Sequence, residues 1–197
     1  PVYGFPVSGY WIDIGTPERL HQAAMDCLSG RVRHFDRKYR YRTNQWIHPS
    51  TLTRIEPLLL SGDITLKGDV SIGRNCRIER GVVIENSHIG HTSLIERDVE
   101  IKESMVMSFA HIKHSVSISR AIVGRHSTLE EHSDLGLDGG AEGVPVIGEN
   151  VILPSESVVA PGVRVAQLKH SHSILATGRF NELGIDERNI YFKEKIR

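Results

Sequence analysis

The sequence lacks three features that would each point to a particular class of protein. Only 2 of its 197 residues are cysteine, so a disulfide framework is excluded, and we expect a reduced, cytoplasmic setting without a signal sequence. No stretch approaches the ~20 apolar residues that a membrane span requires, so we expect no membrane partner. The 24 basic residues balance the 24 acidic ones, and without a basic surface we expect no nucleic acid partner.

What the sequence does contain is an aliphatic residue that returns every five or six positions between Leu60 and Val165. The step is six residues within each triplet and five between triplets, which gives a period of 17. Neither the helical period of 3.6 nor the strand period of 2 fits this spacing, whereas a fixed longer period indicates one structural unit stacked many times. The first twelve anchors are Ile72, Ile78, Ile84, Ile89, Ile95, Ile101, Val106, Ile112, Ile118, Val123, Leu129 and Leu135.

Small residues follow these anchors at a fixed distance of four positions, namely Cys76, Val82, Ser93, Val99, Ala110, Val116, Ser127 and Ser133. A large aliphatic residue fills the interior of a coil, and the small residue fits inside the next corner. The pattern resembles the hexapeptide repeat of left-handed parallel β-helices, in which three short strands make one triangular coil. The resemblance alone implies the left hand, because parallel crossovers are generally right-handed. The alternative, a β-sandwich, would place turn clusters every 8 to 12 residues.

The first 30 residues have a different character. Val7 to Ile14 is rich in β-branched and aromatic residues and predicts a strand. Thr16 and Pro17 predict the start of a helix that ends at Gly30. Because one strand and one helix cannot bury their own apolar faces, we expect residues 1–30 to be the C-terminal edge of an α/β domain. The chain starts with Pro1 rather than Met, so we expect it to begin partway through a larger protein.

Three further segments complete the expected organisation. Residues 31–53 form a basic connector, which is either a strip that binds phosphate or acidic groups or, as we prefer, a solvated linker. Residues 54–168 form the β-helix, and a glycine-rich loop at 136–146 is inserted without loss of phase. Residues 169–197 form a terminal cap, with a short helix at 173–183 and a strand at 190–196. The basic residues of the connector are Arg31, Arg33, Arg37, Lys38, Arg40 and Arg42.

The most specific short motif is the run from Gly9 to Pro17, Gly-Tyr-Trp-Ile-Asp-Ile-Gly-Thr-Pro. It resembles the final strand of the catalytic domain in sugar-1-phosphate nucleotidyltransferases, and most closely the mannose-1-phosphate guanylyltransferase branch. The resemblance implies that Asp13 is one of two carboxylates that hold a catalytic Mg²⁺, which prefers oxygen ligands. The second carboxylate, the glycine-rich nucleotide loop and the phosphate-binding lysine of that family have no counterpart in this sequence.

The sequence contains 11 histidines, a residue type that often takes part in catalysis. Acyltransferases built on hexapeptide repeats use a histidine as general base and bind acetyl-CoA between subunits, and the imidazole suits that role because its pKa lies near 7. His132, just before the glycine-rich loop, is the candidate base. It lies three residues after an anchor, at an outward position of the repeat, so we favour a solvated surface histidine. No histidine spacing predicts a zinc site.

The expected function follows from the order of these parts. The resemblance implies the C-terminal assembly or regulatory portion of an enzyme that converts NTP and sugar 1-phosphate to NDP-sugar and pyrophosphate. Nucleotide and sugar phosphate would bind the preceding domain, so we expect this chain alone to be inactive, without catalytic residues and without a bound cofactor. The faces of the β-helix would form homo-oligomers. The alternatives are a CoA-dependent acyltransferase and a purely structural oligomerisation module.

Overall fold

A computed structural model describes residues 2–6, 8–32, 39–136, 143–167, 174–177 and 190–192. Three of the six basic connector residues, Arg33, Arg37 and Lys38, lie outside the described residues, as does most of the insertion at 137–142. None of the helices within the described ranges has the length and apolar character that crossing a membrane requires.

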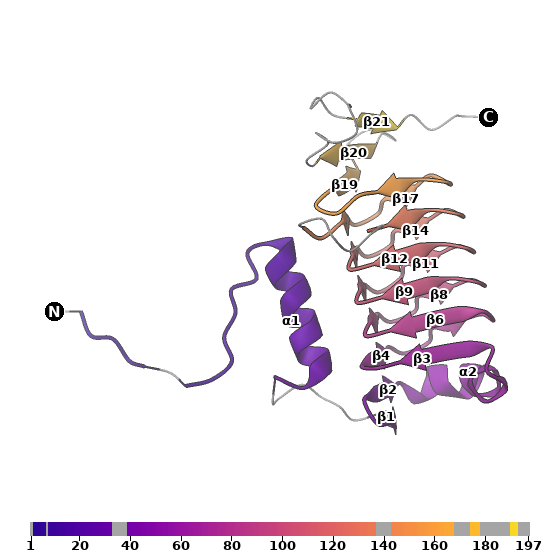
Figure 1. Ribbon diagram of the computed structural model, residues 1–197, viewed down its shortest axis with the longest axis horizontal. Helices are drawn as coiled ribbons and strands as arrows, with labels where there is room; N and C mark the ends of the chain where they lie inside the picture. The colour runs from indigo at the N-terminus through magenta and orange to yellow at the C-terminus, as the bar shows by residue number, and fades with distance from the viewer. Residues whose placement is uncertain are drawn as a thin grey trace.

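Three sheets, numbered in the order in which the chain enters them from β4, form the sides of a prism of stacked coils (Figure 1). The first sheet contains β1 (Arg40–Arg42), β2 (Gln45–Ile47), β4 (Val70–Ile72), β7 (His88–Ile89), β10 (Met105–Val106), β13 (Ile122–Val123), β16 (Val146–Ile147), β19 (Arg164–Gln167), β20 (Ile174–Thr177) and β21 (Ile190–Phe192). The second contains β5 (Arg77–Ile78), β8 (Leu94–Ile95), β11 (His111–Ile112), β14 (Thr128–Leu129) and β17 (Ile152–Leu153). The third contains β3 (Ile64–Lys67), β6 (Val82–Glu85), β9 (Glu100–Lys102), β12 (Ser117–Ser119), β15 (Asp134–Leu135) and β18 (Val158–Val159).

The register of these sheets confirms the repeat and a parallel β-helix, which fits the left-handed form that the resemblance implies. Ile72 pairs in parallel with Ile89, and Val106 with Val123, so each anchor meets the anchor 17 residues further on. Val123 then pairs with Ile147 across the glycine-rich insertion. The insertion therefore leaves the prism at one corner, and the chain returns in the phase that the sequence predicts.

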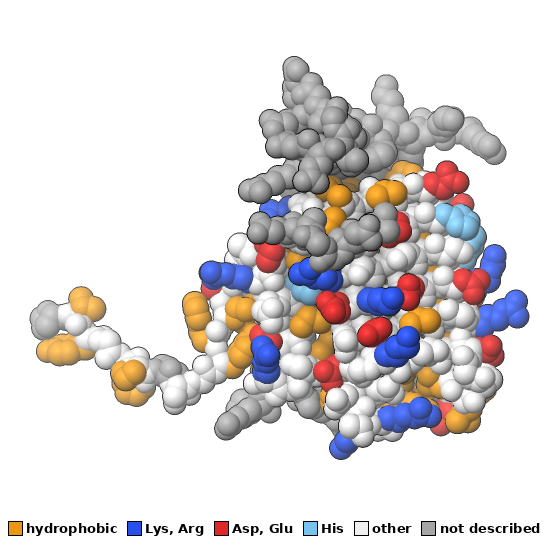
Figure 2. Space-filling view, in the orientation of Figure 1, with side chains coloured by type: hydrophobic (Ala, Val, Ile, Leu, Met, Phe, Trp, Pro, Cys, Tyr) orange, Lys and Arg blue, Asp and Glu red, His pale blue; other side chains and the backbone are white. Residues whose placement is uncertain are grey.

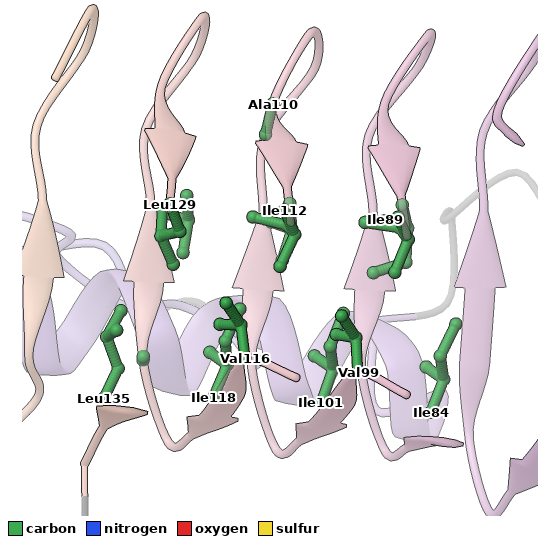
Figure 3. Close-up of a cluster of buried hydrophobic side chains, with 14 of the residues drawn as sticks. Ile84, Ile89, Val99, Ile101, Ala110, Ile112, Val116, Ile118, Leu129 and Leu135 are labelled. Carbon is green, nitrogen blue, oxygen red and sulfur yellow. The ribbon is translucent and has the colours of Figure 1, made fainter. Parts of the chain in front are cut away.

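The interior of the prism holds the predicted anchors. Every one of the twelve is at most 5% exposed, and Figure 3 shows several of them pointing inward from the three sides. The small residues between the anchors are at most 1% exposed. Burial of each large aliphatic side chain contributes about 1.5–3 kcal/mol, so the stacked anchors supply most of the driving force for this fold.

Each corner contains a residue with left-handed backbone geometry. Asn75, Thr92, Phe109, His126 and Asn150 have φ between 55° and 64° and occupy the same corner in successive coils. The corner between the second and third sheets repeats this with Asp98, Ser115, His132 and Glu156. Only glycine and, less readily, asparagine and aspartate adopt this conformation at low cost, so several corners are strained.

Helix α2 (Pro49–Ser61) covers the lower end of the prism and was not expected from the sequence. His48 accepts a hydrogen bond from the Ser50 amide at its N-cap, and Gly62 ends it with a φ of 84°. Ile55, from the buried side of this helix, is 1% exposed and joins the core. Strands β1 and β2 and the first turn of this helix lie within residues 31–53, the segment that the sequence suggested as a connector.

Two secondary-structure predictions are wrong. None of the described residues between Val7 and Ile14 is in a strand, because an isolated extended segment has no neighbouring strand with which to pair. Residues 174–177, expected within a helix, form β20, which pairs antiparallel with β19. Pairing with an open sheet edge satisfies backbone groups that a short helix would leave exposed. The strand predicted at 190–196 is confirmed for Ile190–Phe192, and its remaining residues lie outside those described.

Candidate functional site at helix α1

The motif that carries Asp13 leads directly into helix α1 (Pro17–Ser29). As predicted, Thr16 caps the helix, and its hydroxyl accepts a hydrogen bond from the Arg19 amide at 3.3 Å. Pro17 occupies the first turn, where its missing N–H costs nothing. Gly30 ends the helix with a φ of 90°, and its N–H bonds back to the last turn.

Helix α1 lies along the outer face of the first sheet (Figure 1). Ile122 belongs to this outer face, since its neighbour Val123 points inward, yet only 3% of it is exposed. Pro17 and Leu20 line a groove with Met107, Ile122 and others, so the start of the helix covers this part of the sheet. The cavity in this groove has a volume of about 290 Å³ and is lined by Ile14, Gly15, Thr16, Pro17, Leu20, Met107, Ile122, Gly124, Val146, Ile147, Gly148 and Glu149.

A polar contact fixes the helix against a corner of the prism. His21 is 8% exposed, and its Nε2 lies in hydrogen-bond contact with the backbone oxygen of Glu103. A carbonyl oxygen only accepts, so Nε2 carries the proton. Glu18, one turn earlier, has a pKa below its usual value, because hydrogen bonds with its own backbone and Thr16 outweigh partial burial and the charge of Arg164 adds to them.

Asp26 joins the helix to the segments before and after it. This carboxylate is 6% exposed, and its Oδ2 accepts a hydrogen bond from the Tyr10 hydroxyl at 2.8 Å. Its Oδ1 accepts from Gln22 Nε2 and from an Arg31 guanidinium nitrogen, each at 3.0 Å. Buried carboxylates need such partners. Arg31 thus makes a structural contact with the helix.

Asp13 lies at the exposed start of this unit. Its Oδ1 accepts from the Gly15 amide at 3.1 Å, and its Oδ2 forms an ion pair with Arg19 at 3.5 Å. The side chain remains 58% exposed. Among the residues that the structure describes, no group of three or more acidic, histidine or cysteine side chains is placed to hold a metal ion. One carboxylate, already paired with a cation, does not make a Mg²⁺ site, so these residues alone do not fit the ion.

His132, the candidate acyltransferase base, lies exposed at a corner of the prism with a φ of 58°. Its ring and the His114 ring make a T-shaped contact, with 5.3 Å between centroids. His114 Nδ1 is buried and has no hydrogen-bond partner among the described residues. The outward position that the sequence predicts for His132 is therefore confirmed.

The side chains around this histidine pair are mostly acidic or already paired. Glu96 accepts from His111 Nε2 at 2.7 Å and from the His114 amide at 3.1 Å. Partial burial opposes ionisation of Glu96, but the bond and charge of His111 hold its pKa below the usual value. Lys113 forms ion pairs with Glu130 and Glu131, and the Glu130 hydrogen bond raises its pKa. Figure 2 shows charges of both signs interspersed over the face of the prism that it presents.

The sequence reasoning missed the two residues that hold α1 in place, His21 and Asp26. Both fall on the helix between apolar positions, where the amphipathic pattern offers no reason to single them out. The one signal available in the sequence is an acid within the expected helix with a basic residue five positions later, as in Asp26 and Arg31.

Comparison with known proteins shows to which family the coils are similar. Residues 66–170 match the family model of the GMPPB C-terminal domain. The chain is 29% identical over 174 residues to a glucose-1-phosphate adenylyltransferase of Desulfitobacterium hafniense (strain DSM 10664 / DCB-2), covering 83% of the chain and 40% of that relative. It is 26% identical over 178 residues to the glucose-1-phosphate adenylyltransferase of Desulforamulus reducens, covering 80% and 39%. The chain thus spans about two fifths of the length of these relatives.

Among solved structures, the acetyltransferase domain of PglB from Neisseria gonorrhoeae FA1090 aligns with 62% of this chain and 54% of its own. The identity is 14% and the TM-score 0.40, a likeness on which no functional argument rests. The family match covers more than half of the chain, includes most of the coils and agrees with the resemblance carried by the motif at Asp13. The chain belongs to the GMPPB C-terminal domain family, and its coils are similar to part of two glucose-1-phosphate adenylyltransferases.

Proposed function

We propose that this chain is the assembly portion of an enzyme that converts NTP and sugar 1-phosphate to NDP-sugar and pyrophosphate, and that the chain alone does not catalyse the reaction. The exposed, incomplete environment of Asp13 carries this proposal: its carboxylate has one cation beside it and no cluster of further acids among the described side chains. Nucleotide and sugar phosphate then bind chiefly to a preceding domain, into which the motif at Asp13 extends.

The coils contribute assembly in this proposal. Three flat sheets give the prism long faces, and a flat face can pack against its own copy about a twofold axis. We expect the isolated chain to form homo-oligomers in solution. Sedimentation equilibrium measures this directly, and a mass equal to the 22.0 kDa of one chain at every concentration would contradict it.

The nucleotide base is the finer part of the proposal. The motif at Asp13 resembles the mannose-1-phosphate guanylyltransferase branch, whereas the relatives named above are glucose-1-phosphate adenylyltransferases. We favour the guanylyltransferase, since the family model that matches the coils is the GMPPB C-terminal domain. A cytoplasmic location is consistent with such substrates.

The experiment is an assay of the full-length protein with GTP or ATP, each paired with mannose 1-phosphate or glucose 1-phosphate. Release of pyrophosphate is measured, and Asp13→Asn is compared with Asp63→Asn, an exposed acid near the end of α2. We expect turnover with the native residue, a loss of at least about 100-fold in Asp13→Asn and no change in Asp63→Asn. No turnover with any pair would contradict the proposal.

The acyltransferase remains a second candidate because His132 is exposed beside His114 at the corner that precedes the glycine-rich insertion. The one cation placed near it by the described contacts, Lys113, is held by two glutamates and is poorly available to a CoA phosphate. Calorimetric titration of the chain with acetyl-CoA decides this point. Binding that His132→Ala abolishes would favour the acyltransferase, and absence of binding would remove it.

A further inference from the structure

Asp26 is the point at which three parts of the chain meet. The carboxylate lies on α1, accepts from Tyr10 in the motif that precedes the helix, and accepts from Arg31 in the segment that follows it. The same helix is fixed to the coils through His21 and the backbone oxygen of Glu103. A continuous set of described contacts therefore connects the prism, the helix and the motif.

Chain geometry explains how Tyr10 reaches Asp26. Six extended residues from Tyr10 to Thr16 cover about 20 Å, at roughly 3.3 Å per residue. The ten helical residues from Thr16 to Asp26 rise about 15 Å, at 1.5 Å per residue. The segment before the helix can thus run back beside α1, and the hydrogen bond from Tyr10 closes this arrangement 2.8 Å from Asp26. Asp13 lies near the middle of the returning segment.

The segment has few other described contacts. Trp11 is 82% exposed, and Ile14, which lines the groove over the first sheet, is still 57% exposed, so neither side chain packs into a core. Asp13 contacts Gly15 and Arg19, which are its own neighbours along the chain. The bond between Tyr10 and Asp26 is the contact that fixes the far end of the segment, and the burial of Asp26 makes it less open to competition from water.

We propose that Asp26 is a positioning residue that, through Tyr10, sets the orientation of residues 9–15, including Asp13, on a helix anchored to the β-helix. The coils then act on the nucleotidyltransferase site by holding α1, and not through contact with substrate. The part of this inference that concerns activity rests on the proposed function, whereas the part that concerns orientation does not.

Orientation is measured on the chain itself by ¹⁵N relaxation of the backbone amides of residues 9–15. In Asp26→Asn and Tyr10→Phe we expect their order parameters to fall from about 0.8 to below about 0.6, with no change in the coils. Glu56→Gln, an exposed acid-to-amide change on α2, is the matched control and should leave them unchanged. Tyr10→Phe removes one hydroxyl and leaves Asp26 with its other two partners, so it serves if Asp26→Asn does not fold.

A second readout on the same samples follows Tyr10 by ¹³C NMR of its labelled ring carbon during a pH titration. Partial desolvation and the bond to Asp26 raise the pKa of Tyr10 in the native chain. In Asp26→Asn this pKa should move down toward the ordinary value while the amide signals of the coils keep their native positions. Unchanged order parameters in both variants would overturn the inference.

The full-length protein tests the consequence for catalysis. Because a misplacement of about 1 Å at a catalytic group can cost up to about 100-fold in rate, we expect Asp26→Asn and Tyr10→Phe to lower kcat at least about tenfold. KM for both substrates should stay within about twofold, and Glu56→Gln should match the native protein. Activity that persists in both variants would overturn the positioning role. Absence of activity in the native protein would refute the proposed function. The relaxation measurements would then be the test of whether Asp26 orients residues 9–15.

Discussion

The hydroxyl of Ser87 accepts a hydrogen bond from the backbone N–H of Ser104, which lies one coil further on, with 3.0 Å between oxygen and nitrogen. Ser104 repeats the contact with the amide of Ala121, also at 3.0 Å. Both serines are fully buried. A ladder of side chains thus satisfies amides at this corner, so the small positions of the repeat supply hydrogen bonds as well as space.

Replacing Ser104 by alanine should therefore destabilise the β-helix. The change leaves the Ala121 amide buried without its acceptor, which costs about 1–3 kcal/mol. Ser155→Ala removes the same hydroxyl from an exposed corner and should change stability by less than about 0.5 kcal/mol. Urea unfolding of both variants measures the difference, and equal midpoints would show that the ladder contributes nothing.

The inward phase of the anchors predicts a large difference between two isoleucines. Ile112 is fully buried, so Ile112→Ala should lower the free energy of unfolding by about 2–5 kcal/mol through lost burial and a cavity. Ile152 directly precedes an anchor, points outward and is 49% exposed, so Ile152→Ala should cost less than about 1 kcal/mol. Equilibrium denaturation provides both values. If Ile152→Ala lowered the free energy of unfolding as much as Ile112→Ala, the outer face of the sheet would have to be buried as well, which would contradict the assigned phase.

Strain at the corners predicts a stabilising substitution. Thr92 is exposed and has a φ of 57°, a conformation that is costly for a β-branched side chain. Asparagine tolerates this conformation better, so Thr92→Asn should raise stability by about 1 kcal/mol. Thr128→Asn places the same side chain in a strand and should instead be neutral or destabilising. Melting temperatures of the two variants that shift in the same direction would contradict this explanation.

Acid should weaken the fold through His88. This residue belongs to the outer face of the first sheet, and burial, with a smaller contribution from the charge of His91, lowers its pKa from 6.5 to about 4. The unfolded chain therefore binds the proton more readily, and stability falls as the pH drops from about 6.5 to 4, by at most about 3 kcal/mol. We expect His88→Gln to lose this part of the pH dependence.

The measurement compares the free energy of unfolding of native chain and His88→Gln at pH 7 and pH 4.5. Glu96 and other acids contribute in both proteins, so the difference between the two pH profiles isolates His88. Parallel profiles would show that His88 is protonated as easily in the folded chain as in the unfolded one.

The coils could be predicted because the repeat is short and occurs many times in the sequence. Anchors such as Ile89 and Ile101 each mark the position of a strand, and the insertion before Val146 does not change the phase of the repeat. The caps of α1 could also be predicted, because Thr16 and Gly30 form their capping hydrogen bonds with residues only a few positions away in the sequence.

Features that depend on distant partners were not predictable in this way. The strand expected at Val7 to Ile14 needs a neighbour that none of the described residues supplies. The contact of His21 with Glu103 joins residues 82 apart, and no periodicity connects them. At the candidate site the sequence singled out Asp13 by its motif, but Asp26, which holds that motif through Tyr10, required the structure.

The most direct test of the proposed function uses the isolated 197-residue chain beside the full-length protein in one assay of pyrophosphate release. NTP and sugar 1-phosphate are supplied at saturating concentration with Mg²⁺. We predict turnover by the full-length protein and none above background by the chain, because the described residues around Asp13 do not make a complete site. Turnover by the isolated chain would contradict the account, since these 197 residues would then contain a complete site.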